Sequence, residues 1–206
     1  MFIQAAIDGN DLGSAVLFLK ELSVNKKINF FEVGTSLLLN YGSRATSAFI
    51  EVVSCEKCYC DTKTIDFPAD DIKHHNDLGV RRFSFMAGME IENFKILRDF
   101  SLKKNIDIFV STMGFPLDKL KDRILLLRDI GIRKFICHGS GLSTSVAFSR
   151  LLNALDVCNE IEEIEIIAAG GIGSENVAKL VDYNICGMII GRGLRGFNWS
   201  KENLFL

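Results

Sequence analysis

The residues that could carry chemistry are acids and bases set within otherwise apolar runs. Asp8 ends FIQAAID, Glu32 lies within INFFEVG, Asp61 and Lys63 lie within KCYCDTK, and His138 lies within RKFICHG. Apolar runs of this length indicate buried strands, in which a charged side chain is costly unless it pairs or binds something. These five residues are therefore the first candidates for a functional site.

Asp61 and Lys63 lie two residues apart, so on a strand their side chains share one face. Glu32 and Asp61 could supply two oxygen ligands from neighbouring strands, which suits Mg²⁺ because this ion takes one or two carboxylates and fills its other positions with water and substrate. A buried ion pair that only fixes local geometry is the alternative interpretation. Neighbouring carboxylates also occur in salt-bridge networks without a metal.

Two later runs, AAGGIGS and IIGRG, end in glycines that allow the backbone to approach a phosphate. The candidate phosphate-binding residues in these loops are Gly170, Gly171, Gly191 and Arg192. Arg192 adds a permanent cation that can bind a phosphate through two hydrogen bonds. Ser174 is placed to cap a helix containing Val177, whose first N–H groups would also face the phosphate. Two ordinary glycine turns are the alternative.

The elements that must position these residues alternate along the chain. Between the apolar runs lie segments with helical periodicity, and Pro68, Gly79 and Gly131 stand where helices are expected to begin or end. The β-rich runs are residues 2–7, 28–34, 57–63, 81–88, 106–112, 133–139, 165–171 and 186–192.

Eight such units predict an α/β protein with a parallel sheet closed into a single (β/α)8 TIM barrel over residues 1–206. The candidate residues then fall at the carboxyl ends of their strands, where such barrels build active sites. At 206 residues the chain is short for this fold, which typically needs about 250. Short loops and a short C-terminal helix after GRGLRGF resolve that difference. An open doubly wound sheet is the competing architecture.

Composition narrows the function classes. The net charge of −2 gives no electrostatic case for nucleic acid or an anionic membrane surface as a partner. No run approaches the roughly 20 apolar residues that span a bilayer. The start MFIQAAID lacks the pattern of a signal peptide, and three of the six cysteines lie in apolar segments, as buried free thiols do. We therefore expect a cytoplasmic protein.

The cysteines at 55–60 form the pattern C-x-x-C-x-C, and His74 and His75 follow on the next expected helix. This pattern resembles half of a zinc site, but a structural zinc ion needs four convergent ligands. The cysteines lead directly into a strand, which favours packed or surface thiols.

Six motifs together resemble the orotidine 5′-phosphate decarboxylase suprafamily. They are AID at 6–8, FEVGTSLL at 31–38, DTKTID at 61–66, ICHGSG at 136–141, AAGGI at 168–172 and IIGRGL at 189–194. Within the suprafamily the chain most resembles the branch that holds 3-keto-L-gulonate 6-phosphate decarboxylase and 3-hexulose-6-phosphate synthase. The resemblance runs nearly end to end, and the D-x-K-x-x-D motif is its most specific part.

The resemblance implies roles for the candidate residues. Glu32 and Asp61 match Mg²⁺ ligands, and Asp8 and Lys63 match polar residues around the reacting carbons of a phosphorylated keto-sugar. His138 matches a histidine associated with proton transfer. The glycine-loop residues match phosphate-binding positions. The resemblance also implies a homodimer in which Asp66 reaches the partner's site, and a reaction through a Mg²⁺-stabilised enediolate.

The implied activity is carbon–carbon lyase chemistry. Decarboxylation of 3-keto-L-gulonate 6-phosphate is favoured because GRGL matches the decarboxylases. The alternative is an aldolase of the 3-hexulose-6-phosphate synthase type, which condenses formaldehyde with ribulose 5-phosphate. Ser111 stands where the decarboxylases carry glutamate and the synthases aspartate, and Gly141 stands where the decarboxylases carry arginine. These departures keep a third interpretation open, a barrel that binds a sugar phosphate without turning it over.

Overall fold

The computed structural model describes residues 1–141 and 143–199, which contain a closed barrel of eight parallel strands in chain order. The predicted (β/α)8 fold class is confirmed, and the open sheet is excluded because β1 pairs with β8. The strands are β1 (Phe2–Ile7), β2 (Phe30–Val33), β3 (Cys58–Thr64), β4 (Arg82–Met86), β5 (Asp107–Ser111), β6 (Lys134–His138), β7 (Glu165–Ala169) and β8 (Gly187–Ile190).

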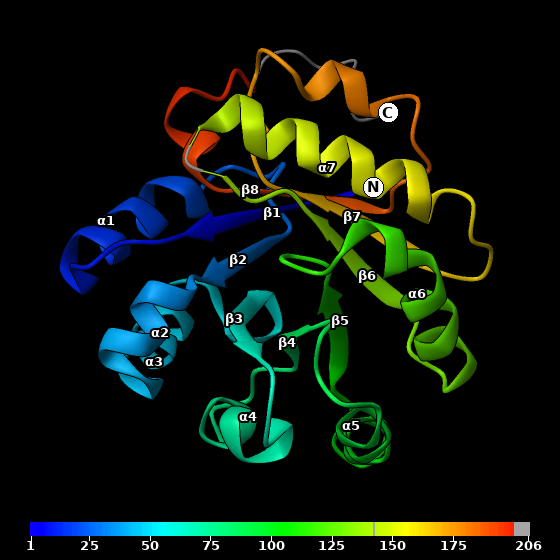
Figure 1. The fold of residues 1–206 in the computed structure, drawn as a ribbon. Coiled ribbons are helices and arrows are strands. Elements are labelled where there is room, and N and C mark those ends of the chain that lie inside the picture. The colour runs from blue at the N-terminus through cyan, green and yellow to red at the C-terminus, as the bar shows by residue number, and fades with distance from the viewer. Residues whose placement is uncertain (142, 200–206) are drawn as a thin grey trace.

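Helices surround the strands (Figure 1), and two of them follow β2. The helices are α1 (Leu12–Ser23), α2 (Thr35–Tyr41), α3 (Ser43–Val53), α4 (Pro68–Asp77), α5 (Ile91–Lys104), α6 (Leu120–Asp129) and α7 (Thr144–Cys158). Short 3₁₀ turns complete the described elements: η1 (Cys55–Lys57), η2 (Leu117–Lys119), η3 (Val177–Leu180) and η4 (Arg192–Gly196).

The expected helix boundaries are found where local chemistry dictates them. Pro68 is the first residue of α4, a position at which the missing N–H costs nothing. Gly79 and Gly131 follow α4 and α6 with φ of 95° and 96°, a conformation that favours glycine. Most of the hydrophobic core lies between the strands and the helices, and a smaller cluster that includes Tyr59 and Phe109 fills the barrel interior.

The chain departs from the expected pattern after β7. Only the 3₁₀ turn η3 forms there, so the prediction of a helix capped by Ser174 is wrong. Asn176 instead folds the loop on itself, because its side chain donates to the Gly171 carbonyl at 2.7 Å and accepts from the Gly173 N–H at 3.0 Å. The expected short C-terminal helix would fall largely on residues 200–206, which lie outside the described residues.

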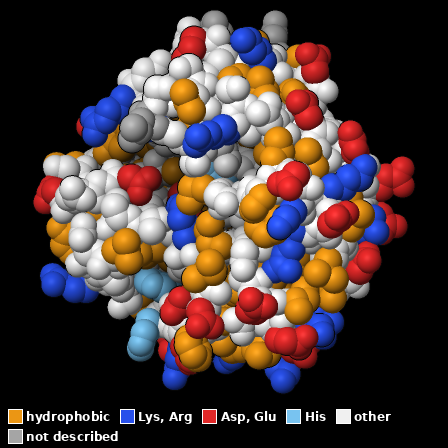
Figure 2. All heavy atoms as spheres, in the orientation of Figure 1, with side chains coloured by type: hydrophobic (Ala, Val, Ile, Leu, Met, Phe, Trp, Pro, Cys, Tyr) orange, Lys and Arg blue, Asp and Glu red, His pale blue; other side chains and the backbone are white. Residues whose placement is uncertain are grey.

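The surface mixes charge types. Acidic and basic side chains are interspersed with apolar ones over the face that Figure 2 shows. Within residues 1–141 and 143–199, no helix is long and apolar enough to cross a membrane.

Candidate functional site

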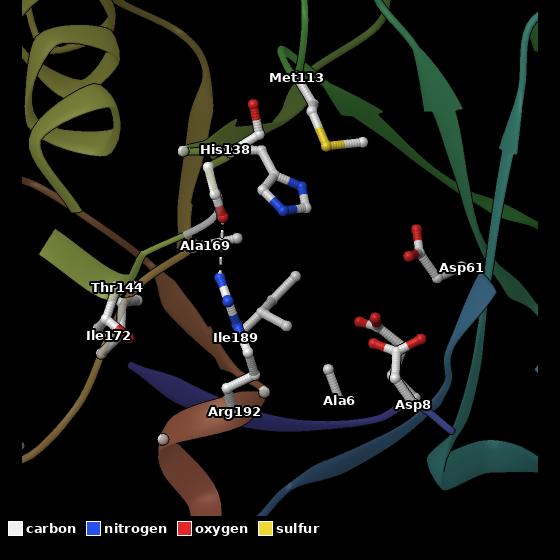
Figure 3. Close-up of a pocket in the computed structure, with 18 of the residues that line it drawn as sticks. Ala6, Asp8, Asp61, Met113, His138, Thr144, Ala169, Ile172, Ile189 and Arg192 are labelled. Carbon is white, nitrogen blue, oxygen red and sulfur yellow. Dashed lines mark hydrogen bonds between the residues drawn. The ribbon is translucent and has the colours of Figure 1, made fainter. Parts of the chain in front are cut away.

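A cavity of about 290 Å³ opens at the carboxyl ends of the strands. Asp8 and Asp61 lie on one side of it, Arg192 lies on the opposite side, and His138 lies between them along the rim (Figure 3). The structure thus brings together nine of the ten predicted site residues. They are Asp8, Glu32, Asp61, Lys63, His138, Gly170 and Gly171, with Gly191 and Arg192.

One side of the cavity, which we call the carboxylate wall, consists of Asp8, Glu32, Asp61 and Lys63. Asp61 is buried, and its two carboxylate oxygens have different partners. Oδ1 accepts a hydrogen bond from Ser84 at 2.7 Å, whereas Oδ2 contacts the Lys63 ammonium and accepts from Thr35 Oγ1 at 2.8 Å. Burial acts to raise the pKa of Asp61, but the charge of Lys63 and these hydrogen bonds outweigh it. The resulting pKa lies below its usual value, so the carboxylate is ionised.

Glu32 is the other buried acid of the carboxylate wall. Its Oε2 accepts from the side-chain amide of Gln4, a buried residue of β1, at 2.5 Å. Burial raises the pKa of Glu32 well above its usual value, and the negative charge of Asp61 raises it further. Two carboxylates therefore share a space in which Lys63 is the one cation close to both, among the described residues.

Asp8 approaches this wall because residue 34 is a glycine. A Cβ at Gly34 would lie 2.1 Å from Asp8 Oδ1 and 2.8 Å from the Ile7 carbonyl oxygen, so a side chain there would displace one or both. Ser36 at the start of α2 donates to Asp8 Oδ1 at 3.2 Å. The glycine of the EVGT motif is thus explained by the position of Asp8.

Ser84 on β4 is a site residue that sequence reasoning missed. Its hydroxyl donates to Asp61 and also accepts the Lys63 backbone N–H at 3.0 Å. In the sequence it is a single serine between Phe83 and Phe85, which gives no signal of a role. Only the pairing of β3 with β4 brings it to the carboxylate wall.

His138 ends β6 at the rim of the cavity. Its Nδ1 lies 3.4 Å from Ser111 Oγ, within hydrogen-bonding distance. Burial lowers the pKa of His138 to about 4, and the charge of Lys63 lowers it further, while Asp61 acts in the opposite direction. The imidazole is therefore uncharged at neutral pH.

The opposite side of the cavity, which we call the glycine cradle, consists of Gly170, Gly171, Gly191 and Arg192. The two glycines after β7 have φ of 98° and 68°, and they pack closely against other backbone. A Cβ at Gly170 would lie 1.9 Å from the Gly139 carbonyl oxygen, and one at Gly171 would lie 2.4 Å from the Thr144 carbonyl oxygen. Close packing thus accounts for both glycines.

Gly191 differs, because a Cβ there would meet nothing closer than 3.8 Å and the position borders open space. Arg192 runs along this side of the cavity and donates to the Gly141 carbonyl at 3.2 Å (Figure 3). Thr144, the first residue of α7, also lines the cavity. The helix N-terminus beside the cradle is therefore that of α7, a 15-residue helix, and not one after Ser174. Exposed N–H groups and the helix dipole favour an anion there.

Asp66 is the one predicted site residue outside the cavity. It is exposed, and its Oδ1 accepts from the Phe67 N–H at 2.9 Å and from Asn93 Nδ2 at 3.2 Å. Its neighbours Ile65 and Phe67 are 59% and 68% exposed. Asp66 thus does not serve the site of its own chain in this arrangement.

The cysteine motif faces away from the cavity. Cys58 and Cys60 are buried on the outer side of β3, and Thr46 Oγ1 lies 3.5 Å from Cys60 Sγ and 2.7 Å from His75 Nδ1. All six cysteines are free thiols. Within the described residues, no group of three or more His, Cys, Asp or Glu side chains is arranged to hold a metal ion.

Comparison with known proteins finds enzymes of similar fold. The chain is 21% identical over 195 residues to the 3-hexulose-6-phosphate synthase of Bacillus subtilis, covering 94% of this chain and 90% of that protein. The crystal structure of 3-hexulose-6-phosphate synthase from Salmonella typhimurium superposes with a TM-score of 0.81 at 22% identity, covering 95% of this chain and 91% of that one. No family model matches the chain.

A second enzyme group is also similar in fold. The structure of 3-keto-L-gulonate-6-phosphate decarboxylase from Vibrio cholerae superposes with a TM-score of 0.78 at 23% identity, covering 94% of this chain and 89% of that one. Both groups are the members of the orotidine 5′-phosphate decarboxylase suprafamily that the motifs resemble. The resemblance is therefore confirmed at the level of the fold, and the chain has the barrel of these synthases and decarboxylases.

Proposed function

We propose that this chain is a Mg²⁺-dependent carbon–carbon lyase that decarboxylates 3-keto-L-gulonate 6-phosphate or a close analogue. One observation carries the proposal: a single cavity has the carboxylate wall on one side and the glycine cradle on the other. A short phosphorylated sugar could span the two, with its phosphate on the cradle and its reacting carbons at the wall. The names of the synthase and decarboxylase relatives, both of which specify a sugar 6-phosphate, support this substrate class.

The glycine cradle suits a phosphate for three reasons. The α7 N-terminus supplies exposed N–H groups, Gly191 leaves space, and Arg192 supplies a cation. Arg192 already donates a hydrogen bond to the Gly141 carbonyl, so its guanidinium lies close to the position proposed for the phosphate. We assign the cradle to holding the substrate.

The carboxylate wall fits Mg²⁺. Glu32 and Asp61 present hard oxygen donors to one cavity, where burial and the charge of Asp61 disfavour ionisation of Glu32 and a bound divalent cation would offset the second negative charge. These two residues would hold the ion. When bound, Mg²⁺ would stabilise negative charge that develops on the substrate oxygens during cleavage of the carbon–carbon bond.

The remaining side chains act on charge and protons. Lys63 is held by Asp61 and by Thr35, at 2.7 Å from Thr35 Oγ1, so its ammonium is fixed beside the reacting carbons. A fixed cation at that position stabilises the transition state without reorganising. His138 is uncharged above about pH 4, so it can accept a proton or hold a water molecule, with Ser111 orienting its ring.

A second candidate is the aldolase reaction of the 3-hexulose-6-phosphate synthase type. Two observations favour it: the Bacillus subtilis protein that is similar in sequence is a synthase, and an uncharged His138 can remove a proton beside a carbonyl group. The same cavity would serve, since both reactions place a phosphate opposite a developing negative charge.

We also propose a homodimer in which Asp66 completes the partner's site. Asp66 lies outside the cavity of its own chain, and the exposed side chains of Ile65 and Phe67 flank it. Exposed large apolar side chains next to each other are typical of subunit contacts. Light scattering measures the molar mass in solution, which should be twice the 23.0 kDa of one chain. A mixture of inactive Asp66→Asn and inactive Lys63→Ala proteins should regain activity if sites form between chains.

The deciding experiment incubates the purified protein with each substrate, with Mg²⁺ or with a chelator. Release of CO₂ from 3-keto-L-gulonate 6-phosphate is expected, and loss of formaldehyde with ribulose 5-phosphate would establish the aldolase instead. Turnover that does not depend on Mg²⁺, or no turnover of either substrate, would reject the proposal of a Mg²⁺-dependent lyase. Binding of a sugar phosphate without turnover, unaffected by Asp61→Asn, would identify a non-catalytic barrel.

A further inference from the structure

The carboxylate wall contains an irregular stretch of strand. Cys60 pairs with Phe83 and Thr64 pairs with Phe85, so β3 advances four residues while β4 advances two. The extra residues form a bulge that contains both Asp61 and Lys63. Lys63 has φ of 48°, in the left-handed region that residues other than glycine rarely adopt. Such a conformation persists only where neighbouring contacts hold it.

Ser84, the residue of β4 between the two paired positions, supplies those contacts. It is fully buried, with 0% exposure, and it does not line the cavity. Its Oγ donates to Asp61 Oδ1 at 2.7 Å and accepts the Lys63 N–H at 3.0 Å. Its carbonyl oxygen accepts from Thr62 Oγ1 at 2.7 Å. One residue therefore binds three consecutive residues of the bulge.

These contacts determine how the wall meets the substrate. The hydrogen bond to Oδ1 fixes the plane of the Asp61 carboxylate, and the hydrogen bond from the Lys63 N–H fixes the backbone from which the ammonium extends. Without the Ser84 hydroxyl, the Lys63 N–H would lose its acceptor and the strained backbone could relax toward a regular strand. The ammonium would then leave its place beside Asp61 and Thr35.

We propose that Ser84 is a positioning residue for the reaction, which orients Asp61 and Lys63 without touching the substrate. This inference rests on the proposed lyase function. It assigns a catalytic effect to a buried hydroxyl on β4, one strand away from the residues of the D-x-K-x-x-D motif.

The test compares Ser84→Ala with Ser84→Thr, which keeps the hydroxyl, and with Ser84→Cys, which keeps the size and weakens the hydrogen bonds. In Ser84→Ala, kcat should fall about 10- to 100-fold, the effect of removing a buried hydrogen bond to a charged group. KM should change less than about threefold, because the glycine cradle is untouched. Ser84→Thr should restore kcat to within about threefold of the parent, with Ser84→Cys in between.

A matched control removes a different buried serine hydroxyl. Ser101 on α5 donates to the Arg98 carbonyl at 2.7 Å and lies outside the barrel. Ser101→Ala should leave kcat and KM unchanged at temperatures where the protein is folded. An equal fall of kcat in both variants would show a general loss of stability and would overturn the positioning role.

A second measurement does not depend on activity. Amide hydrogen exchange followed by NMR reports the Lys63 N–H directly, and Ser84→Ala should speed its exchange about tenfold or more, while Ser84→Thr should not. Unchanged Lys63 exchange, or unchanged kcat in Ser84→Ala, would overturn the proposal. If the parent protein turns over neither substrate, the proposed function has failed, and the exchange rate of Lys63 alone decides whether Ser84 holds the bulge.

Discussion

The two sides of the cavity are built by different means. The carboxylate wall is a network of buried side chains, in which Asp61 alone has three side-chain partners. The glycine cradle is made largely of backbone, a helix N-terminus and one exposed arginine. A network of buried charges fixes geometry and tolerates little change, whereas a backbone surface binds one charged group and tolerates loss of a side chain. The wall should therefore control kcat, and the cradle should control KM.

The largest expected effect comes from Asp61→Asn. The change removes a negative charge that Lys63 is paired with and one of the two proposed donors to Mg²⁺, so kcat should fall by about three orders of magnitude or more. Mg²⁺ dependence should disappear while the circular dichroism spectrum stays that of the parent. Retained Mg²⁺-dependent activity would reject the metal assignment.

Lys63→Ala should be nearly as severe. Removing the fixed ammonium should lower kcat about 100- to 1000-fold, with KM within about threefold, because the proposed role of the lysine is to stabilise charge that develops only in the transition state. Steady-state kinetics measures both constants. A rise in KM with an unchanged kcat would show that Lys63 binds the substrate and does not stabilise the transition state.

Arg192→Ala tests the other side of the cavity. Loss of a cation on the cradle should raise KM about 10- to 100-fold and change kcat less than about fivefold. Inorganic phosphate should inhibit the parent protein competitively and inhibit this variant weakly. An unchanged KM would contradict a phosphate role for Arg192.

Gly34→Ala tests how closely the wall is packed. The added Cβ would collide with Asp8 Oδ1 and the Ile7 carbonyl, so the free energy of unfolding should fall by about 1–3 kcal/mol. Displacement of Asp8 should also lower kcat about tenfold, and urea unfolding and kinetics measure the two effects. Gly196→Ala is the control, because a Cβ at Gly196 meets nothing within 4 Å. Equal effects of the two substitutions would refute the role given to Gly34.

The smallest expected effect concerns pH. The pKa of His138 is lowered from 6.5 to about 4. Between pH 4 and pH 6.5, His138 is therefore protonated in the unfolded chain and unprotonated in the folded protein. The free energy of unfolding should therefore fall as the pH falls through that window, and His138→Gln should make the fall shallower. Chemical denaturation at pH 7, 6, 5 and 4 measures the slopes. Identical slopes in both proteins would show that His138 is not buried as described.

The fold and most of the site could be predicted from the sequence, because both depend on local patterns. Eight apolar runs predict eight strands, and a parallel barrel places acids at strand ends, such as Glu32 and Asp61, next to one another. The glycines after β7 and β8 also indicate which loops line the other side of the cavity. These features need only alternation and spacing.

The rest depends on tertiary contacts that no local pattern contains. Ser84 became visible only through the shifted pairing of β3 with β4, and the low pKa of His138 follows from burial that the sequence does not specify. The helix N-terminus at the cradle belongs to α7, because the segment after β7 is held in a compact loop by Asn176.

The central claim is that one substrate spans both sides of the cavity. The most direct measurement compares turnover of the phosphorylated keto-sugar with turnover of the same sugar lacking its phosphate, each with and without Mg²⁺, by CO₂ release and by formaldehyde consumption. The account predicts rapid, Mg²⁺-dependent turnover of one sugar phosphate and at least about a 1000-fold lower kcat/KM for the unphosphorylated sugar. Equal turnover of both sugars, or turnover of neither, would contradict it.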